Sequence, residues 1–126
     1  MTFYQGKSPE ISQTFKTKKE EKMVVLIMKW DILPDKVEEY TAWAKSAVQI
    51  QLAVPGVKEF RAYRPVTGSH QALVTYEFDN FAAWETWQNN EDVQKTREEW
   101  FTLTTNRYTE LWGPSPVVPE PIRPGT

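Results

Sequence analysis

The chain has 126 residues, 15 lysines and arginines against 17 acidic residues, and a net charge of −2. This length suits one domain of common size, and there is no overall positive field to attract nucleic acid or an anionic membrane. The chain has no cysteine and one histidine. These counts exclude disulfides, thiolate nucleophiles, zinc–cysteine sites, iron–sulfur clusters and a multi-histidine metal site within one chain.

Hydrophobic runs in the chain are short. The longest spans residues 23–28, far below the about 20 residues that a helix needs to cross a bilayer. No charged segment followed by an apolar one opens the chain, so nothing suggests secretion. We expect a soluble, cytoplasmic protein with no membrane and no nucleic acid among its partners.

The two ends of the chain differ from its centre. Residues 1–22 show no sustained period and are rich in lysine, which predicts a mobile N-terminal arm, or one that folds back or crosses a partner subunit. Residues 114–126 hold five of the nine prolines and predict an extended C-terminal tail. This tail would lie along the domain or a partner subunit, or serve as a PxxP-type ligand. The folded domain is expected over residues 23–113.

The first elements of this domain are a strand and a helix. Residues 23–30 are apolar on both faces and predict a central, well-covered strand. Pro34 suits a first helical position, and apolar residues then recur at helical spacing as far as Gln51. Val54-Pro55-Gly56 ends the helix, because a residue before proline leaves the α region.

Two strands, a broken helix and a fourth strand follow. Residues 57–64 and 70–78 alternate between apolar and polar, with hairpin-loop residues between them. Asp79-Asn80 can cap a short helix, and a second helical piece begins at residues 90–92. Residues 106–112 alternate as a fourth strand.

The order β-α-β-β-α-β predicts an α+β, ferredoxin-like fold. Its four-stranded antiparallel sheet has helices on one face only. The other face is half polar, with Glu59, Arg61, Thr75 and Glu77 interrupted by Tyr63 and Leu73. A second subunit commonly covers such a face, so we expect a homodimer with two-fold symmetry.

Three sequence blocks occur in a distinctive order. They are LPDKVEEY at residues 33–40, VPGVKEFRAYR at residues 54–64 and YEFDNFAAWETW at residues 76–87. Their order and spacing resemble the antibiotic-biosynthesis-monooxygenase-like family of the dimeric α+β barrel superfamily. The resemblance covers roughly residues 23–112 and implies a homodimer whose sheets pack face to face, with a pocket in each subunit between the sheet and its helices.

The resemblance also bears on cofactors. The family includes cofactor-independent monooxygenases of aromatic polyketides and haem-degrading enzymes. In the haem-degrading branch an Asn on strand one, a Trp ending strand three and a His on the second helix carry the chemistry. This chain has no Asn in residues 23–30, has Phe78 at the strand position and has Arg97 near the helix position. Haem degradation is therefore not expected, and no cofactor is predicted. The oxygenase branch also keeps a Trp where Phe78 stands, and Phe78 has no indole N–H to donate.

Two residues are candidates for catalysis. His70 is the only side chain with an ordinary pKa near neutrality, but it stands beside a Gly-Ser turn, and a solvated or interface position is the alternative. Arg97 could stabilise negative charge on an enolate or a peroxide.

The aromatic residues on the helices and on strand three suggest a ligand pocket. They either fill the space between sheet and helices or line a slot for a flat, apolar ligand. The predicted pocket residues are Tyr40, Tyr76, Phe78, Trp84, Arg97 and Trp100. Trp43 and Trp87 are expected off the main apolar stripes, against a partner subunit or the terminal segments.

Two functions remain open from the sequence. One is a cofactor-independent monooxygenase-like activity on a small flat aromatic or quinone-like molecule. The other is a non-catalytic, small-molecule-binding or stress-associated homodimer that uses the same slot.

Overall fold

A computed structural model of the chain describes residues 22–125. Residues 1–21, nearly all of the expected N-terminal arm, and Thr126 lie outside the described residues. The elements are β1 (Val24–Ile32), the 3-10 turn η1 (Pro34–Lys36), α2 (Val37–Ala53), β2 (Val57–Tyr63), β3 (Ala72–Phe78), α3 (Phe81–Gln88), α4 (Glu91–Leu103) and β4 (Thr104–Trp112). No helix in this described part is long and apolar enough to cross a membrane.

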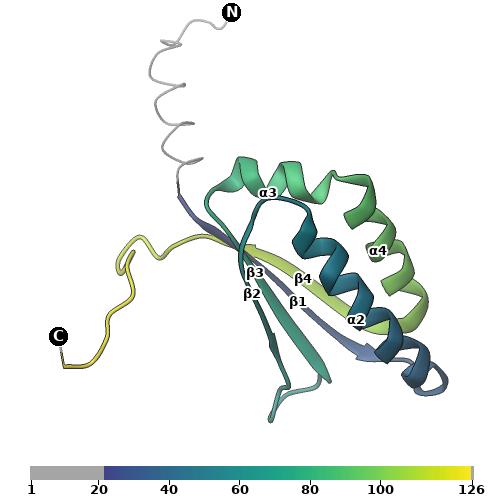
Figure 1. Cartoon of the computed structure of the whole chain (residues 1–126). Coiled ribbons are helices and arrows are strands. Elements are labelled where there is room, and N and C mark those ends of the chain that lie inside the picture. The colour runs from purple at the N-terminus through teal and green to yellow at the C-terminus, as the bar shows by residue number, and fades with distance from the viewer. Residues whose placement is uncertain (1–21, 126) are drawn as a thin grey trace, which may run out of the picture.

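The strands form one four-stranded antiparallel sheet in the order β2-β3-β1-β4. Helices α2, α3 and α4 lie over the same face of this sheet (Figure 1). This is the ferredoxin-like arrangement that the element order predicts, and its central strands are the apolar β1 and the alternating β3.

Three predicted boundaries are wrong by a few residues. β1 extends to Ile32, and β4 begins at Thr104 instead of Asn106, because Asp31 and Ile32 pair with Thr105 and Thr104. Helix α4 therefore passes into β4 without a loop. At the β2–β3 hairpin, β3 begins at Ala72 and leaves His70 outside the strand.

The core lies between the sheet and the helices. Val74, Tyr76 and Phe78 alternate along β3, and all three are buried against the helices, as the sequence alternation predicts. Phe78 is 0% exposed, and its ring packs against Trp87 with centroids 5.2 Å apart. Large aromatic side chains of this kind supply most of the apolar area buried in a domain of this size.

An asparagine cap begins each of the two helices α3 and α4. The Asn80 side chain accepts a hydrogen bond from the backbone N–H of Ala83 at 2.8 Å. Asn90 begins α4 in the same way and accepts from Asp92 and Val93. Each cap satisfies backbone donors that the first helical turn leaves free. The two short helices can therefore turn their aromatic residues toward the sheet separately.

The sheet face opposite the helices is the half-polar one. In register across it lie Glu59 with Glu77, Arg61 with Thr75, and Tyr63 with Leu73. Tyr108 and Trp112 of β4 also lie on this face, and Tyr63, Tyr108 and Trp112 are exposed. No helix of residues 22–125 lies on this side of the sheet in Figure 1.

The C-terminal segment that follows β4 contains neither a helix nor a strand as far as residue 125. It leaves the end of the sheet as an extended trace (Figure 1). Val117 and Ile122 are largely exposed in this tail.

Gly56, at the turn that leads into β2, has a backbone conformation and surroundings that disfavour a side chain. Its φ is +131°, and a Cβ there would lie 3.4 Å from the Ala83 carbonyl oxygen and from Trp87 Cβ. Gly68 also has a positive φ, +94°, but a Cβ there would meet nothing within 4 Å. We expect Gly56→Ala to lower the free energy of unfolding by about 2–3 kcal/mol, since strain and crowding combine.

Gly68→Ala is the matched control for this change and should cost about 1–2 kcal/mol, from backbone strain alone. Urea denaturation of both variants provides the comparison. Equal losses for the two variants would show that the contact with α3 adds nothing.

Candidate active site

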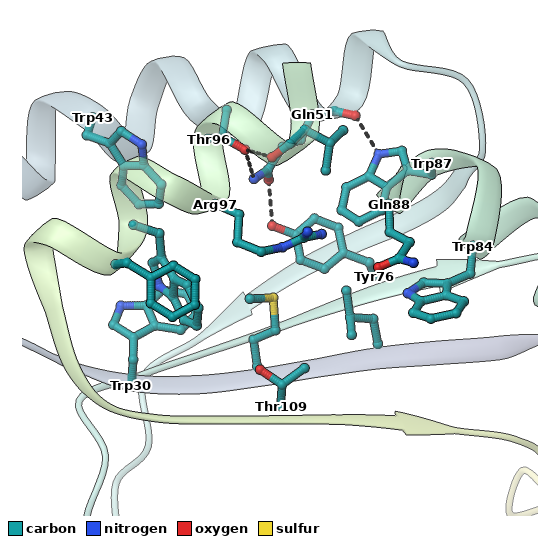
Figure 2. Close-up of a pocket in the computed structure, with 15 residues that line it drawn as sticks. Trp30, Trp43, Gln51, Tyr76, Trp84, Trp87, Gln88, Thr96, Arg97 and Thr109 are labelled. Carbon is teal, nitrogen blue, oxygen red and sulfur yellow. Dashed lines mark hydrogen bonds between the residues drawn. The ribbon is translucent and has the colours of Figure 1, made fainter. Parts of the chain in front are cut away.

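A cavity of about 300 Å³ lies between the sheet and the helices. This volume is at the lower end of the range for small-molecule sites, about 300–1,000 Å³. β1, β3 and β4 supply one wall, and α2, α3 and α4 supply the other (Figure 2). The aromatic part of the lining consists of Trp30, Trp43, Tyr76, Trp84, Trp87, Trp100 and Phe101.

Arg97 is the only ionised group of this lining at neutral pH. It lies on α4 and extends into the middle of the cavity (Figure 2). Within residues 22–125 its guanidinium makes no hydrogen bond and no ion pair. Burial lowers the pKa of Arg97, and the nearby Tyr76 opposes this shift. An arginine side chain nevertheless stays protonated, so the cavity presents one cation without a counter-charge.

A hydrogen-bonded chain centred on Gln51 holds the cavity wall together. The Tyr76 hydroxyl donates to Gln51 Oε1 at 2.6 Å, and Gln51 Nε2 donates to Thr96 Oγ1 at 2.9 Å. Trp87 Nε1 donates to the Gln51 carbonyl oxygen at 3.0 Å. These bonds join β3, α2, α3 and α4 in one network (Figure 2). Buried networks of this kind are stiff when every member is satisfied.

Because Tyr76 is buried within this network, its contribution to folding stability depends on pH. Desolvation raises the pKa of Tyr76; the Tyr40 phenol adds to the shift and Arg97 opposes it. The unfolded chain ionises this group near pH 10, while the folded chain keeps it neutral. Stability from this residue is therefore complete below about pH 10 and falls by about 1.4 kcal/mol per pH unit above it.

The alkaline loss should be smaller in Tyr76→Phe, although that variant is less stable at neutral pH because it lacks the bond to Gln51. Thermal unfolding of the wild type and of Tyr76→Phe, followed between pH 8 and pH 11, measures both slopes, and an unchanged slope in Tyr76→Phe contradicts the assignment.

Two indole N–H groups in the cavity wall have no acceptor. They belong to Trp84 and Trp100, and both nitrogens are buried without a hydrogen-bond partner in the described part of the chain. The other wall indoles are satisfied: Trp30 donates to the Tyr40 hydroxyl, Trp43 to Glu99 and Trp87 to Gln51. A buried donor without an acceptor costs about 1–3 kcal/mol.

Four of the six residues predicted for the pocket lie on the cavity wall: Tyr76, Trp84, Arg97 and Trp100. Tyr40 and Phe78 do not line it. Tyr40 accepts the hydrogen bond from Trp30 at 3.1 Å, and Phe78 packs behind Trp87. Tyr40 and Phe78 therefore lie behind tryptophans of the cavity wall and pack against them.

The expectation for Trp43 and Trp87 is wrong. Both line the cavity, and Trp87 is only 2% exposed. Helical spacing could have predicted this position for both residues. Trp43 is four residues from Ala47 and eight from the buried Gln51. Trp87 is three residues from Trp84. Residues three or four apart share a helix face.

His70 lies away from the cavity. It precedes β3, and its Nε2 is 3.0 Å from the Asn106 backbone oxygen. No cavity-lining residue is a histidine or a carboxylate. In residues 22–125 no three His, Asp or Glu side chains come close enough together to hold a metal ion.

The cavity opens between α4 and β4. Phe101 of α4 is 51% exposed, and Thr109 of β4 is exposed as well. The other lining residues are buried or half-buried. A ligand would therefore enter over the edge strand of the sheet.

The fold and the cavity define a class: a ferredoxin-like α+β domain with an aromatic cavity between its sheet and its helices. The family model for antibiotic biosynthesis monooxygenase matches residues 23–99. The chain belongs to this family, as its sequence blocks suggested.

Solved structures show the same fold at low sequence identity. A protein of the Dabb family with a ferredoxin-like fold from Mesorhizobium loti has 18% identity and a TM-score of 0.66, over 75% of this chain and 98% of that one. SnoaB, a cofactor-independent oxygenase from Streptomyces nogalater, has 12% identity and a TM-score of 0.63, over 79% and 99%. A dimeric protein of unknown function from Bacteroides fragilis has 15% identity and a TM-score of 0.57, over 72% and 95%. No curated protein matches the chain by sequence.

Proposed function

We propose that the chain is a cofactor-independent monooxygenase-like enzyme that acts on a small flat aromatic or quinone-like molecule. The observation that carries this proposal is the aromatic cavity of about 300 Å³ with the unpaired Arg97 inside it. Membership of the antibiotic biosynthesis monooxygenase family supports it. So does the likeness in fold to a cofactor-independent oxygenase.

The chemistry needs no electron donor besides the substrate. A ring CH₂ group activated by a neighbouring carbonyl loses a proton and forms an enolate. The enolate passes one electron to O₂, and the two radicals combine to a peroxide anion, which takes up a proton to give the hydroperoxide. Loss of water then leaves a carbonyl, so that CH₂ and O₂ give C=O and H₂O. Arg97 would hold the anionic oxygen of the enolate and then of the peroxide in a site largely closed to water.

The proton of this reaction has no acceptor in the cavity wall. The wall has no carboxylate and no imidazole. The Tyr76 hydroxyl donates to Gln51, and its raised pKa keeps it neutral. The substrate must therefore be acidic enough to ionise beside Arg97, with its proton leaving through the opening near Phe101.

Oxygen consumption tests the proposal. The chain, treated with a chelator, is incubated with a panel of anthrones, quinols and catechols, and uptake of O₂ is followed with an electrode. We expect uptake above the rate without protein, and the anthrones, which carry the activated CH₂ group, should give the matching carbonyl product. No uptake with any of them would overturn the enzymatic function.

A second candidate is a non-catalytic, small-molecule-binding or stress-associated homodimer. The lack of a proton acceptor in the cavity wall favours it. Binding of the same aromatic compounds without any O₂ uptake would identify this function.

A homodimer is part of both proposals. Tyr63, Tyr108 and Trp112 are exposed on the sheet face opposite α2, α3 and α4. Exposed aromatic residues on one face are typical of a protein–protein interface, and a related fold belongs to a dimeric protein. Light scattering should give twice the 14.7 kDa mass of the chain.

Tyr63→Glu is expected to weaken the dimer at least about tenfold, because two-fold symmetry places the new charge twice in one interface. Val66→Glu is the control, since Val66 is 94% exposed in the loop after β2. A monomeric wild type, or equal loss of the dimer in both variants, would count against this face.

A further inference from the structure

The sheet face opposite α2, α3 and α4 carries opposite charges at its two edges. Arg61 lies on the edge strand β2, and Glu110 lies on the other edge strand, β4. The register pairs Arg61 with Thr75, Thr75 with Ile27 and Ile27 with Glu110. These four residues therefore form one row across the sheet, with a cation at one end and an anion at the other.

Arg61 has no ion pair in the part of the chain that the structure describes. Its side chain is exposed, and its guanidinium lies over the Tyr63 ring, 5.7 Å from the ring centroid. Glu110 cannot reach it within one sheet, because three strand spacings of about 4.8 Å each separate the two edges. The cation on β2 therefore lacks an anion from its own chain.

The Glu110 carboxylate is held in place on β4. It accepts hydrogen bonds from the Tyr108 hydroxyl and, at 2.8 Å, from Trp112 Nε1. The Lys29 ammonium lies over the Tyr108 ring, 5.3 Å from its centroid, and forms no ion pair with Glu110. A carboxylate that is already fixed loses little further freedom when it binds a cation.

Two aligned sheets can pack face to face about a two-fold axis that runs either across the strands or along them. With the axis across the strands, β2 faces β2 and β4 faces β4, so the arginines stay on one side of the interface and the glutamates on the other. With the axis along the strands, the β2 edge of each copy lies over the β4 edge of the other. Only this second arrangement brings the opposite charges together.

The geometry points to a homodimer whose two-fold axis runs along the strands, in which Arg61 of each copy pairs with Glu110 of the other. This inference rests on the homodimer of the proposed function and adds its arrangement. The ion pair occurs twice, once at each side of the interface. Between the two pairs lie the apolar side chains of β1 and β3 on this face: Val25, Ile27 and Leu73. An apolar centre with a polar rim is typical of protein–protein interfaces.

The same axis also matches aromatic residues. Tyr63 and Tyr108 share the next row of the sheet, because Tyr63 pairs with Leu73, Leu73 with Lys29 and Lys29 with Tyr108. Tyr63 of one copy therefore faces Tyr108 of the second copy. Both tyrosines are exposed in the single chain, and paired aromatic rings in an interface stabilise it beyond the area that they bury.

Charge reversal tests the ion pair. Arg61→Glu and Glu110→Arg are each expected to weaken the dimer at least about tenfold, because each variant places two like-charge contacts in one interface. The double variant restores opposite charges and should dimerise at least about threefold more tightly than either single variant. Lys95→Glu makes the same charge change at an exposed position on α4 and should keep the wild-type affinity. Sedimentation equilibrium of the full chain measures each dissociation constant.

Introduced thiols test the direction of the axis, since the chain has no cysteine of its own. A chain with both Arg61→Cys and Glu110→Cys should be joined to a second copy by a bismaleimide of about 10 Å, the spacing of packed sheets. Arg61→Cys alone should give little product, because the proposed axis puts its two copies at opposite edges of the interface. Efficient cross-linking of Arg61→Cys alone would overturn this axis.

The outcomes separate the arrangement from the proposed function. A dimeric wild type whose double variant is no tighter than the single variants would overturn the ion pair and leave the homodimer in place. A monomeric wild type would overturn both. Neither measurement depends on turnover, so a dimer with the rescued ion pair would support the arrangement even if the chain consumed no O₂.

Discussion

Replacing Arg97 by glutamine is expected to lower the rate of oxygen consumption by about 100- to 1,000-fold, the usual cost of removing one donor to a developing oxyanion. The physical reason is the position of the guanidinium, which is the only cation in the cavity lining and has no counter-charge within residues 22–125. Glutamine keeps hydrogen-bonding capacity but not the charge, so the substrate should also ionise at a higher pH in the variant. Steady-state O₂ uptake across a pH series measures both effects.

Two further variants make this result specific. Arg97→Lys restores a charge without the planar fork of donors and should recover part of the lost rate. Lys95→Gln, from the exposed face of α4, should keep the full rate. A similar loss in Lys95→Gln would point to a general effect of net charge, and full activity in Arg97→Gln would remove Arg97 from the mechanism.

Replacing Trp87 by alanine is expected to lower the free energy of unfolding by about 3–5 kcal/mol, the range for large aromatic side chains in a core. Trp87 is 2% exposed, and its ring contacts Tyr76 at 5.1 Å and Phe78 at 5.2 Å between centroids. Its Nε1 also donates to the Gln51 carbonyl. The substitution therefore removes a large apolar surface and leaves a buried carbonyl without its donor.

Trp87→Phe separates these two contributions. It keeps most of the ring contact and loses the indole donor, so it should cost about 1–3 kcal/mol, less than the alanine variant. Urea denaturation followed by circular dichroism measures both. A loss below about 1 kcal/mol for Trp87→Ala would show that this ring does not carry the packing that its burial implies.

Much of the fold could be predicted because its elements carry separate local signals. The alternation that ends at Phe78, the proline at Pro34 and the turn at Gly56 each mark an element without reference to distant residues. The true start of β4 could not be found in this way. Thr104 enters the strand because it pairs with Ile32, and such pairing is set by the sheet as a whole.

The sequence predicted the candidate site less completely than the fold. Helical spacing brings Trp84, Arg97 and Trp100 to the sheet side, and these residues line the cavity. Whether Tyr40 lines the cavity or lies behind Trp30 depends on side-chain direction, which spacing alone does not give. The sequence also could not show that Arg97 has no ion-pair partner in the described residues, since pairing depends on which side chains lie near it in three dimensions.

The direct passage of α4 into β4 has a consequence for how a ligand enters. Phe101 and Thr109, the two exposed borders of the opening, belong to one continuous stretch with no hinge between helix and strand. The Arg107 guanidinium lies over the Phe101 ring at 4.6 Å and donates hydrogen bonds to the Phe101 and Thr104 carbonyls, which fastens this corner. Entry at this border therefore does not require the slow opening of a hinged lid between helix and strand.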